Sequence, residues 1–522
     1  MCVAINLLKE GIRDFVILEK STGFGGTWKD NAYPGCCCDI LSRLYCYSFE
    51  QNPNWSRLFP EQGEILNYIR DVARKYDLYR YVRFSSEVTE ATWEPLSQQW
   101  RVLVRVLAGK EAEACDNYTI KAGFVAAGLG QLSEPYRPEI AGEAAFRGKI
   151  MHSARWDWSC DLSGKRVGII GNGATSVQIV PEVAKVASHL TIFQRSPNWV
   201  IPRMNEDVPG WKRTLLQKVP FLLNRLRAEA MDSREAYFQA LIQRESADFM
   251  QSQLPDRPDL WETLTPDYPP GCKRILLSDD YYPALRLPNV RLETRRIQRI
   301  TKDGIVTGKD GGAEEAIELD VIIFATGFST QNFMHGIKVQ GLGGTPLDEI
   351  WAKGASALYG VTVESLPNFG MLYGPNTNLG HNSIVLMIEA QTRYILSLVK
   401  ETFKARQRGR SISFTPRPER VKEWNQELHR ALASSSFADP RCQSWYKTED
   451  GLYQKTLSRI DWSDYEIKGD AETLQVLKGE SYIGRVVEET IVGARTLIAG
   501  AVFSAVAAGG LLLQARGRLA LR

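Results

Sequence analysis

The hydrophobic and polar positions at the start of the chain follow first a helical and then a strand period. Residues 3–10 (VAINLLKE) carry apolar side chains at helical spacing, and Gly11 stands where a helix C-cap is expected. Residues 14–19 (DFVILE) form an apolar run typical of a buried parallel strand. We therefore expect the second half of a βαβ unit here, and expect its first strand and glycine turn to precede Met1.

The same reading along the chain predicts two further groups of elements. A smaller antiparallel layer is expected from strands at 82–92 and 100–107, with a further strand at 119–127. A second βαβ unit follows: a strand at 165–170, a glycine turn at 171–176, a helix at 177–187 and a strand at 190–194. Helical periods at 211–250 predict a helical insertion, and strands return at 290–328 with a hairpin turn at Asp303 and Gly304.

The composition is that of an ordinary globular protein and does not by itself indicate a reaction. The 522 residues are 44% hydrophobic and 24% charged, as in ordinary globular proteins, and the net charge is only +3. Lys and Arg are spread along the chain, so nucleic acid is not expected as a partner. Nine cysteines without a secretory leader predict reduced thiols, no disulfides and a cytoplasmic location. Adjacent Cys36, Cys37 and Cys38 cannot readily close one tetrahedral site, so we expect packed thiols and no metal.

An uncharged segment at residues 496–513 lies between Arg495 and Arg516. A spanning helix needs about 20 apolar residues, so this segment is marginal and is diluted by Gly and Ala. Two interpretations stay open: a docked terminal helix, or a membrane anchor that would make the protein membrane-associated through residues 496–513.

The second glycine turn predicts an NADPH site. Gly171 and Gly173 precede a helix, whose free N–H groups suit a pyrophosphate, and Ser176 is small enough for helix–strand packing. The next strand ends in Gln194, Arg195 and Ser196, without a carboxylate for a free ribose diol. An arginine at that place suits a 2′-phosphate.

The first unit predicts a different ligand. Its strand ends in Glu19, a hydrogen-bond acceptor for an unmodified ribose as in FAD or NAD. Residues 25–28 (GGTW) follow directly, and this order resembles flavoprotein monooxygenases, in which the acid contacts the FAD ribose and the G-G-T-W turn lies along the cofactor. The resemblance implies FAD at Glu19, Gly25, Gly26, Thr27 and Trp28.

Residues 146–157 (FRGKIMHSARWD) fit the pattern F-x-G-x-x-x-H-x-x-x-W-[PD] through Phe146, Gly148, His152 and Trp156. This pattern is the fingerprint of the Baeyer–Villiger monooxygenases, which the chain resembles up to about residue 450. Neighbouring segments agree, among them 193–199 (FQRSPNW), 325–328 (ATGF) and 374–378 (GPNTN).

The resemblance implies roles for individual residues. Arg274 corresponds to the catalytic arginine beside the flavin and Asp39 to the carboxylate that orients it, while Lys273 and Arg195 correspond to the cations around the NADP 2′-phosphate. His152 belongs to the interdomain fingerprint and is expected to couple domain movement. The cofactor-binding residues implied by motif and resemblance are Glu19, Gly25, Gly26, Thr27, Trp28, Asp39, Tyr45, Gly171, Gly173, Ala174, Thr175, Ser176, Arg195, Ser196, Lys273, Arg274, Thr326, Gly327 and Asn378.

The expected fold is therefore α/β, with two Rossmann-like dinucleotide-binding domains, the NADP domain being inserted in the FAD domain. The expected boundaries are 1–150 and 329–480 for the two parts of the FAD domain, 151–210 and 266–328 for those of the NADP domain, 211–265 for the helical insertion, and 481–522 for a C-terminal tail.

The implied activity is NADPH- and O2-dependent oxidation of a small-molecule ketone to an ester or lactone through a C4a-peroxyflavin, by analogy in secondary-metabolite biosynthesis. A guanidinium keeps its proton, which suits it to stabilise an oxygen anion. Two alternatives stay open: a monooxygenase acting on nitrogen or sulfur, and a truncated, non-catalytic paralogue that lacks the first glycine motif.

Overall fold

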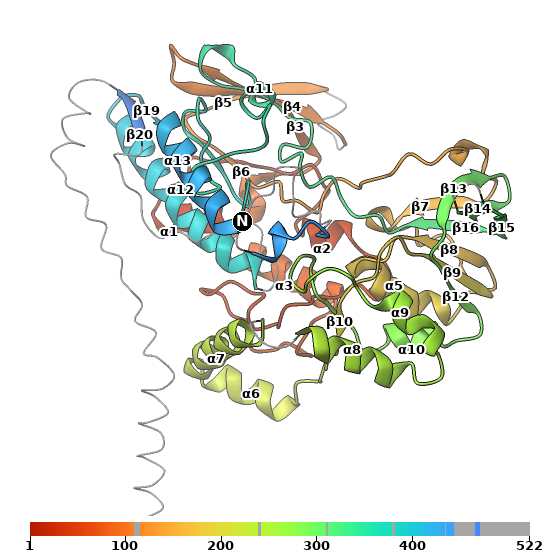
Figure 1. Ribbon diagram of the computed structural model, residues 1–522. Helices are drawn as coiled ribbons and strands as arrows, with labels where there is room; N and C mark the ends of the chain where they lie inside the picture. Colours follow the sequence, from red (N-terminus) through yellow and green to blue (C-terminus); the bar gives the residue numbers. More distant parts are fainter. Residues whose placement is uncertain are drawn as a thin grey trace, which may run out of the picture.

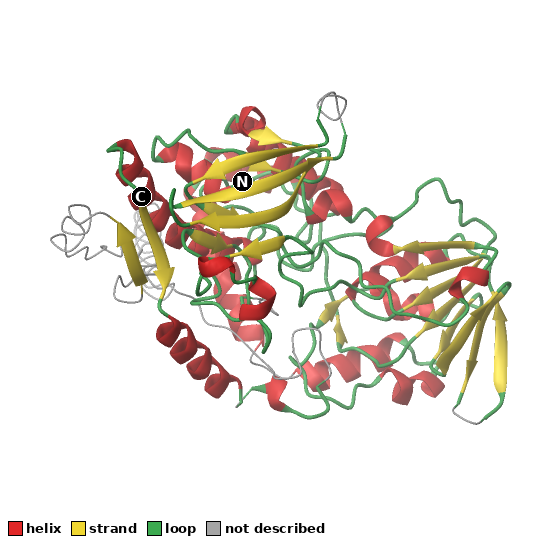
Figure 2. Cartoon of the chain, turned by 90° about the horizontal axis from the view of Figure 1, so that it is seen from above, coloured by secondary structure: helices red, strands yellow, loops and turns green. Residues whose placement is uncertain are grey.

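The protein forms two lobes, each built around its own sheets (Figures 1 and 2). The computed structural model describes residues 1–108, 115–238, 242–309, 312–377, 382–433, 435–442 and 465–469. One lobe contains the chain start and a four-stranded, mostly antiparallel sheet, and the other contains a five-stranded parallel sheet with a smaller antiparallel sheet beside it. This arrangement confirms the α/β fold with two lobes.

The second lobe is centred on a five-stranded parallel sheet with the order β12-β9-β8-β16-β7. Its strands are β7 (Lys149–His152), β8 (Arg166–Ile170), β9 (His189–Phe193), β12 (Val290–Glu293) and β16 (Val321–Phe324). Helix α5 (Ala174–Ala184) joins β8 to β9, as the second βαβ unit predicts. The helix begins three residues earlier than expected because the glycine turn comprises only residues 171–173.

An antiparallel sheet lies beside this parallel sheet. It contains β13 (Arg296–Thr301), β14 (Gly304–Gly308) and β15 (Glu314–Glu318). The expected hairpin is present, but its turn is Lys302 and Asp303, and Gly304 is the first residue of the returning strand. The lack of a side chain at Gly304 lets β14 and β15 approach closely, because a Cβ atom would lie 1.9 Å from the Ile317 carbonyl oxygen.

The first lobe contains a four-stranded sheet with the order β17-β3-β4-β5. Its strands are β3 (Ser86–Glu94), β4 (Gln99–Val106), β5 (Asn117–Ala122) and β17 (Lys338–Gln340). Trp93 and Trp100 pack in its core, and the Trp100 indole N–H donates to the Pro367 carbonyl oxygen at 2.8 Å.

Two expected strands of this lobe are each divided between sheets. The strand expected at 82–92 is β2 (Val82–Arg83) and β3, separated at Ser85, whose φ is +51°. The strand expected at 119–127 is β5 and β6 (Val125–Ala127), separated at Gly123. Ser85 with Ser86 and Gly123 mark the two breaks, but the apolar residues on either side of each break still read as one strand.

The chain start forms less sheet than expected. Helix α1 (Cys2–Lys9) is confirmed, and Gly11 has the positive φ of a C-cap residue, +78°. The strand expected at 14–19 is only β1 (Ile17–Leu18), which is half-buried and pairs in parallel with β2 alone among the described residues. A second parallel pair joins β6 to β18 (Phe369–Met371). The strand expected to precede Met1 stays a prediction.

The remaining elements surround these sheets. The helices are α2 (Thr27–Asp30), α3 (Gln62–Lys75), α6 (Gly210–Lys218), α7 (Phe221–Phe238), α8 (Ile242–Gln253), α9 (Trp261–Leu264), α10 (Tyr281–Leu285), α11 (Leu347–Ile350), α12 (Ile384–Gln407) and α13 (Pro418–Leu432). The short strands are β10 (Val200–Ile201), β11 (Leu276–Leu277), β19 (Ile412–Pro416) and β20 (Tyr465–Gly469), and 3-10 turns lie at Leu78–Tyr81, Glu143–Ala145, Ser153–Arg155, Pro258–Leu260, Leu342–Gly344 and Ser436–Ala438. Helices α6 to α8 confirm the helical character expected at 211–250.

Within the described ranges, no helix is both long and apolar enough to cross a bilayer. The candidate anchor at 496–513 lies outside the described residues and stays a prediction.

The expectation of reduced thiols throughout is wrong at one pair. Cys272 and Cys442 form a disulfide with Cα atoms 5.5 Å apart, and both residues are buried. They lie 170 positions apart, so only tertiary packing brings them together. The bond attaches the segment after α13 to the loop that leads into β11. Cys36, Cys37 and Cys38 are buried free thiols, as expected, and burial raises the pKa of Cys36 to about 12 and that of Cys37 to about 11.

We expect reduction of this bond to destabilise the protein. A cross-link across so long a segment limits the unfolded chain, so its loss is expected to lower the free energy of unfolding by about 2–4 kcal/mol. Urea denaturation with and without dithiothreitol measures the difference. Cys442→Ser is the control and is expected to be insensitive to the reductant. Alkylation of all nine cysteines in unreduced, denatured protein would contradict the assignment.

Candidate active site

An arginine–aspartate pair lies where the two lobes meet. Arg274 stands on the loop before β11, and its Nη2 donates to Oδ1 of Asp39 at 2.6 Å, while Nε donates to Oδ2. Both side chains retain contact with solvent, with exposed fractions of 21% for Arg274 and 24% for Asp39. Two parallel hydrogen bonds fix the plane of the guanidinium as well as its position.

The loops on either side of this pair are held by buried contacts. Strand β11 pairs with β10, and the loop that contains Arg274 packs on Trp199, Tyr268 and the Cys272–Cys442 bond. The Trp199 indole N–H donates to the Tyr268 carbonyl oxygen at 3.0 Å. The structure therefore brings together Arg274 and Asp39, 235 positions apart in the sequence, on loops held by buried contacts.

Gln178 of α5 connects the Asp39 segment to the second lobe. Its Nε2 donates to the Cys37 carbonyl oxygen at 3.1 Å, and its Oε1 accepts from the Tyr33 hydroxyl at 2.9 Å. Gly35 passes so close to this helix that a Cβ atom would lie 2.4 Å from the Gln178 carbonyl oxygen. Sequence reasoning missed Gln178, because an amide on a helix gives no signal of what it contacts across a domain boundary.

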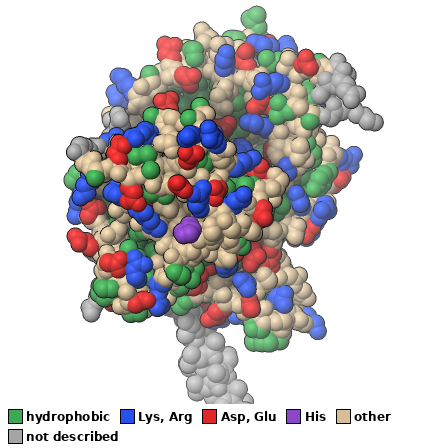
Figure 3. All heavy atoms as spheres, turned by 90° about the vertical axis from the view of Figure 1, so that its right-hand side faces the viewer, with side chains coloured by type: hydrophobic (Ala, Val, Ile, Leu, Met, Phe, Trp, Pro, Cys, Tyr) green, Lys and Arg blue, Asp and Glu red, His purple; other side chains and the backbone are tan. Residues whose placement is uncertain are grey.

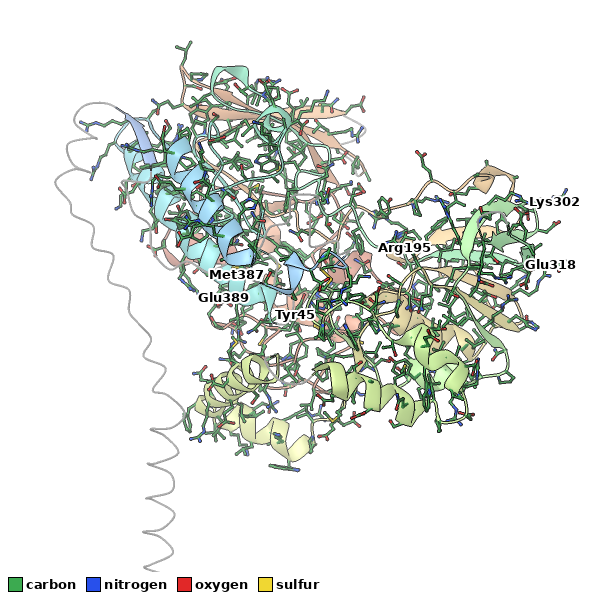
Figure 4. All side chains as sticks on the ribbon, viewed as in Figure 1. Tyr45, Arg195, Lys302, Glu318, Met387 and Glu389 are labelled. Atoms are coloured by element: carbon green, nitrogen blue, oxygen red, sulfur yellow. A yellow bond between two sulfur atoms is a disulfide. The ribbon has the colours of Figure 1, made fainter. Side chains whose placement is uncertain are left out.

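The two cations expected at the 2′-phosphate, Lys273 and Arg195, lie close to one another beside Ser196 and form a cationic cluster. The Lys273 Nζ donates to the Ser196 Oγ at 2.9 Å and lies 4.5 Å above the Tyr268 ring. Burial, and then the nearby charge of Arg195, lower the pKa of Lys273. Arg195 lies two residues after the end of β9, at the edge of the second lobe (Figure 4). The two neighbouring positive charges repel one another, and a bound dianion would relieve this repulsion. The pair is therefore a suitable site for a phosphate.

The glycine turn before α5 has the shape that a phosphate requires. Gly171 has a φ of +113°, and a Cβ atom there would lie 2.4 Å from the Ala325 carbonyl oxygen. Space around Gly173 is open, so a ligand can approach the first N–H groups of the helix at Ala174 and Thr175. Ser176 is fully buried, as its packing role predicts.

The fingerprint residues lie at the junction of the lobes. His152 ends β7 beside β16 and the segment with Thr326 and Gly327. Its Nδ1 accepts from the Ala154 N–H at 3.1 Å, and its Nε2 lies 3.4 Å from the Thr326 Oγ1. Burial is the main reason that the pKa of His152 is lowered to about 4, so the ring is neutral near pH 7.

The other fingerprint residues serve packing. A Cβ atom at Gly148 would lie 2.7 Å from the Phe146 ring, so only glycine fits against this side chain. Trp156 packs against the core of the parallel sheet, with its ring centre 6.1 Å from that of Trp158. The fingerprint thus shapes the connection between the lobes.

The neutral state of His152 gives a pH-dependent stability. The unfolded chain takes up a proton as the pH falls through about 6.5, whereas the folded chain does so only near pH 4. Stability is therefore lost as the pH falls between these values. We expect the melting temperature of the wild type to fall more between about pH 7 and pH 5 than that of His152→Gln. Equal falls in both proteins would contradict this assignment.

The residues expected at FAD lie around α2 and β1. Glu19 directly follows β1, its Oε1 accepts from the Ser21 N–H at 2.7 Å, and burial raises its pKa. Gly26 has a φ of +50° before α2, which begins at Thr27. Gly25 has a φ of +145°, and a Cβ atom there would lie 2.8 Å from the Cβ atom of Lys29, so this position favours glycine.

Trp28 and Tyr45 form a buried polar contact beside these residues. The Trp28 indole N–H donates to the Tyr45 hydroxyl at 3.0 Å, and burial raises the pKa of Tyr45, which therefore stays neutral. Asn378 lies outside the described residues, and its role stays a prediction.

Glu389 of α12 is a buried carboxylate that sequence reasoning missed. It accepts from the Ser48 N–H at 2.7 Å and from the Ser48 hydroxyl at 2.5 Å. Figure 4 labels it with Met387 and Tyr45, on the same lobe. The sequence offered one indication of this residue: a carboxylate among the apolar positions of a 24-residue helix. Its bonds attach the Tyr45 segment to α12.

Comparison with known proteins agrees with this geometry. Residues 7–337 match the family model described as flavin-binding monooxygenase-like. The FAD-binding monooxygenase ktnD of Aspergillus niger is 47% identical, covering 99% of this chain and 87% of the relative. A Baeyer–Villiger monooxygenase of Streptomyces coelicolor is 36% identical, with 89% and 90% covered.

Solved structures show the same fold. The complex of OTEMO with FAD and NADP superposes with a TM-score of 0.76 at 25% identity, covering 90% of this chain and 97% of that one. An oxidised steroid monooxygenase bound to NADP gives 0.74 at 28% identity, with 87% and 92% covered. The chain therefore belongs to the flavin-binding monooxygenase-like family and, within it, to the Baeyer–Villiger monooxygenases.

Proposed function

We propose that the chain binds FAD and NADPH and uses O2 to oxidise a ketone to an ester or lactone. The observation that carries this proposal is the bidentate Arg274–Asp39 pair at the junction of two nucleotide-binding lobes. The relatives with Baeyer–Villiger activity in their names, and the FAD and NADP in the related structures, support it. FAD, when bound, supplies the oxygen-activating redox chemistry.

The role of Arg274 follows from its hydrogen bonds. Its guanidinium cannot give up a proton, and Asp39 holds it in one orientation. A fixed positive charge stabilises an adjacent oxygen anion without protonating it, and needs no reorganisation when the charge develops. Arg274 therefore provides charge stabilisation, and Asp39 acts as its positioning residue.

The cationic cluster and the glycine turn account for NADPH. Arg195, Lys273 and Ser196 present two positive charges and a hydroxyl where a 2′-phosphate fits. The open space at Gly173 admits a pyrophosphate to the start of α5. The neutral His152 beside Thr326 positions the connection between the lobes and transfers no proton at neutral pH.

Labelled oxygen tests the reaction directly. Purified full-length protein supplemented with FAD is incubated with NADPH, 18O2 and a panel of cyclic and linear ketones. We expect an ester or lactone that contains one 18O atom from O2. A thioether and a tertiary amine in parallel reactions test the alternative: oxidation of these compounds with no ester would assign the chain to nitrogen or sulfur oxygenation. An absence of NADPH-dependent flavin reduction would indicate a non-catalytic protein.

The ketone is proposed only as a class. The A. niger relative is 47% identical over nearly the whole chain, which supports a substrate from fungal secondary metabolism. Polyketide-derived aromatic and alicyclic ketones therefore belong in the panel beside simple cyclic ketones.

A further inference from the structure

Large apolar side chains are exposed on α6 and its flanks. The exposed fractions are 70% for Trp211, 65% for Met204, 63% for Phe221 and 41% for Leu215. Trp211 and Leu215 stand four positions apart, so they share one face of α6, while Leu216 lies about 100° further around the helix and is buried. Helix α6 thus presents an apolar face to solvent in addition to the one that it packs inward. We name Trp211 and Leu215 of α6, together with Phe221 at the start of α7, the α6 apolar face.

Helix α6 and the start of α7 are basic, and of the two acidic residues just before α6, Glu206 and Asp207, the latter pairs with Arg57 at 2.9 Å. Residues 208–228 contain five basic side chains and no acidic one. Arg225 pairs with Glu229 at 2.9 Å and Arg227 is buried, but Lys212 and Lys218 have no carboxylate partner within the described ranges. The α6 apolar face is therefore bordered by uncompensated positive charge.

The surface of the second lobe differs in this respect. Its acidic and basic side chains are interspersed (Figure 3), and they pair with one another. Arg291 donates to Glu315 at 2.7 Å and Arg299 to Glu314 at 2.8 Å. Lys212 and Lys218 differ from these paired side chains.

The position of α6 allows contact with a large flat surface. Figure 1 shows α6 and α7 at one extremity of the molecule, beyond the sheets of both lobes. Exposed tryptophan and phenylalanine beside lysines are typical of helices that lie in a membrane interface. A second copy is a less suitable occupant, because two-fold pairing would bring Lys212 and Lys218 of both copies together.

We propose that the α6 apolar face docks the protein on an anionic lipid bilayer. Trp211, Leu215 and Phe221 enter the headgroup region, and Lys212 and Lys218 contact lipid phosphates. Apolar area and electrostatic attraction both contribute to such binding, which is reversible when the inserted surface is small. The inference is independent of ketone oxidation, since vesicle binding requires no turnover.

Vesicle co-sedimentation of the full-length protein tests the proposal. We expect wild-type protein to sediment with phosphatidylcholine–phosphatidylserine vesicles and far less with phosphatidylcholine alone. The combined change Trp211→Ser, Leu215→Ser and Phe221→Ser is expected to lower the partition coefficient about tenfold or more. Leu96→Ser, at a fully exposed leucine on the turn between β3 and β4, is the matched control and is expected to bind as wild type.

A second pair of variants measures how much the positive charge of Lys212 and Lys218 contributes to vesicle binding. Lys212→Glu with Lys218→Glu is expected to abolish the preference for anionic vesicles, whereas Lys338→Glu with Lys353→Glu makes the same change of charge elsewhere and is expected to retain it. Wild-type binding is expected to weaken as salt rises from about 0.15 M to 1 M, because the Debye length falls from about 8 Å to 3 Å.

Three results would overturn the proposal. They are wild-type protein that does not sediment with anionic vesicles, a triple variant that binds as wild type does, and a wild-type dimer that the triple variant converts to a monomer in light scattering. The last result would assign the face to a second copy of the chain. Circular dichroism and activity on a water-soluble ketone verify that the triple variant is folded.

Discussion

Replacing Arg274 by alanine is expected to lower ester formation about 100- to 1,000-fold, the usual effect of removing one preorganised donor for an oxygen anion. The side chain is held by two hydrogen bonds to Asp39, so its charge stays in place throughout the reaction. NADPH oxidation should continue in the variant, because the cationic cluster is untouched. The measurement is ester formed per NADPH oxidised, with hydrogen peroxide determined in the same samples.

Two matched variants separate charge from position. Arg274→Lys retains a positive charge but loses the two-pronged contact with Asp39, and we expect intermediate activity. Asp39→Asn keeps the shape of its partner but removes its charge, which weakens the orientation of Arg274 and is expected to lower ester yield by about tenfold. Unchanged ester yield in Arg274→Ala would overturn the assigned role.

The second nucleotide-binding lobe could be predicted from sequence because local signals determine it. Gly171 must be glycine for two reasons, a positive φ and a close approach to the Ala325 carbonyl oxygen. The apolar strands β8 and β9 are buried on both faces of a parallel sheet, so their sequences read as continuous apolar runs. In this lobe the local preferences of the sequence and the observed fold therefore predict the same elements.

The predictions that were wrong concern features that depend on a residue far away in the sequence. The apolar run at 14–19 predicts a strand, but strand length is set by the neighbour, and in the part of the chain that the structure describes β1 pairs with the two residues of β2 alone. Nothing in the spacing of Cys272 and Cys442 identifies them as a pair, because their contact depends on how the segment after α13 packs. The thiol expectation came from composition, which carries no geometric information.

The candidate site shows the same division. Individual charges such as Asp39 and Arg274 have no local signature, so only the resemblance to a family singled them out. The structure adds what the resemblance could not supply: the hydrogen bonds between them and the contact of Gln178 that holds the Asp39 segment. Interdomain contacts of this kind require coordinates.

Replacing both Arg195 and Lys273 by alanine is expected to lower kcat/KM for NADPH about 1,000-fold, because each charge-assisted hydrogen bond to a phosphate contributes about 1.5–3 kcal/mol. NADH lacks the 2′-phosphate, so its kcat/KM should change little. Steady-state kinetics with both coenzymes measure the ratio, and Lys302→Ala, an exposed lysine of the same lobe (Figure 4), is the control. An equal loss with NADPH and NADH would show that the two cations act elsewhere.

Lys273 also gives this site a pH signature. Burial and Arg195 lower its pKa in the free protein, whereas a bound phosphate dianion raises it again. The NADPH complex therefore binds more protons than the free protein, and KM for NADPH should rise as the pH increases through the lowered pKa of Lys273. KM for NADH should lack this rise. Lys273→Arg keeps its charge at alkaline pH and is expected to remove the rise while retaining the preference for NADPH. A rise of the same size in Lys273→Arg would assign the titration to another group.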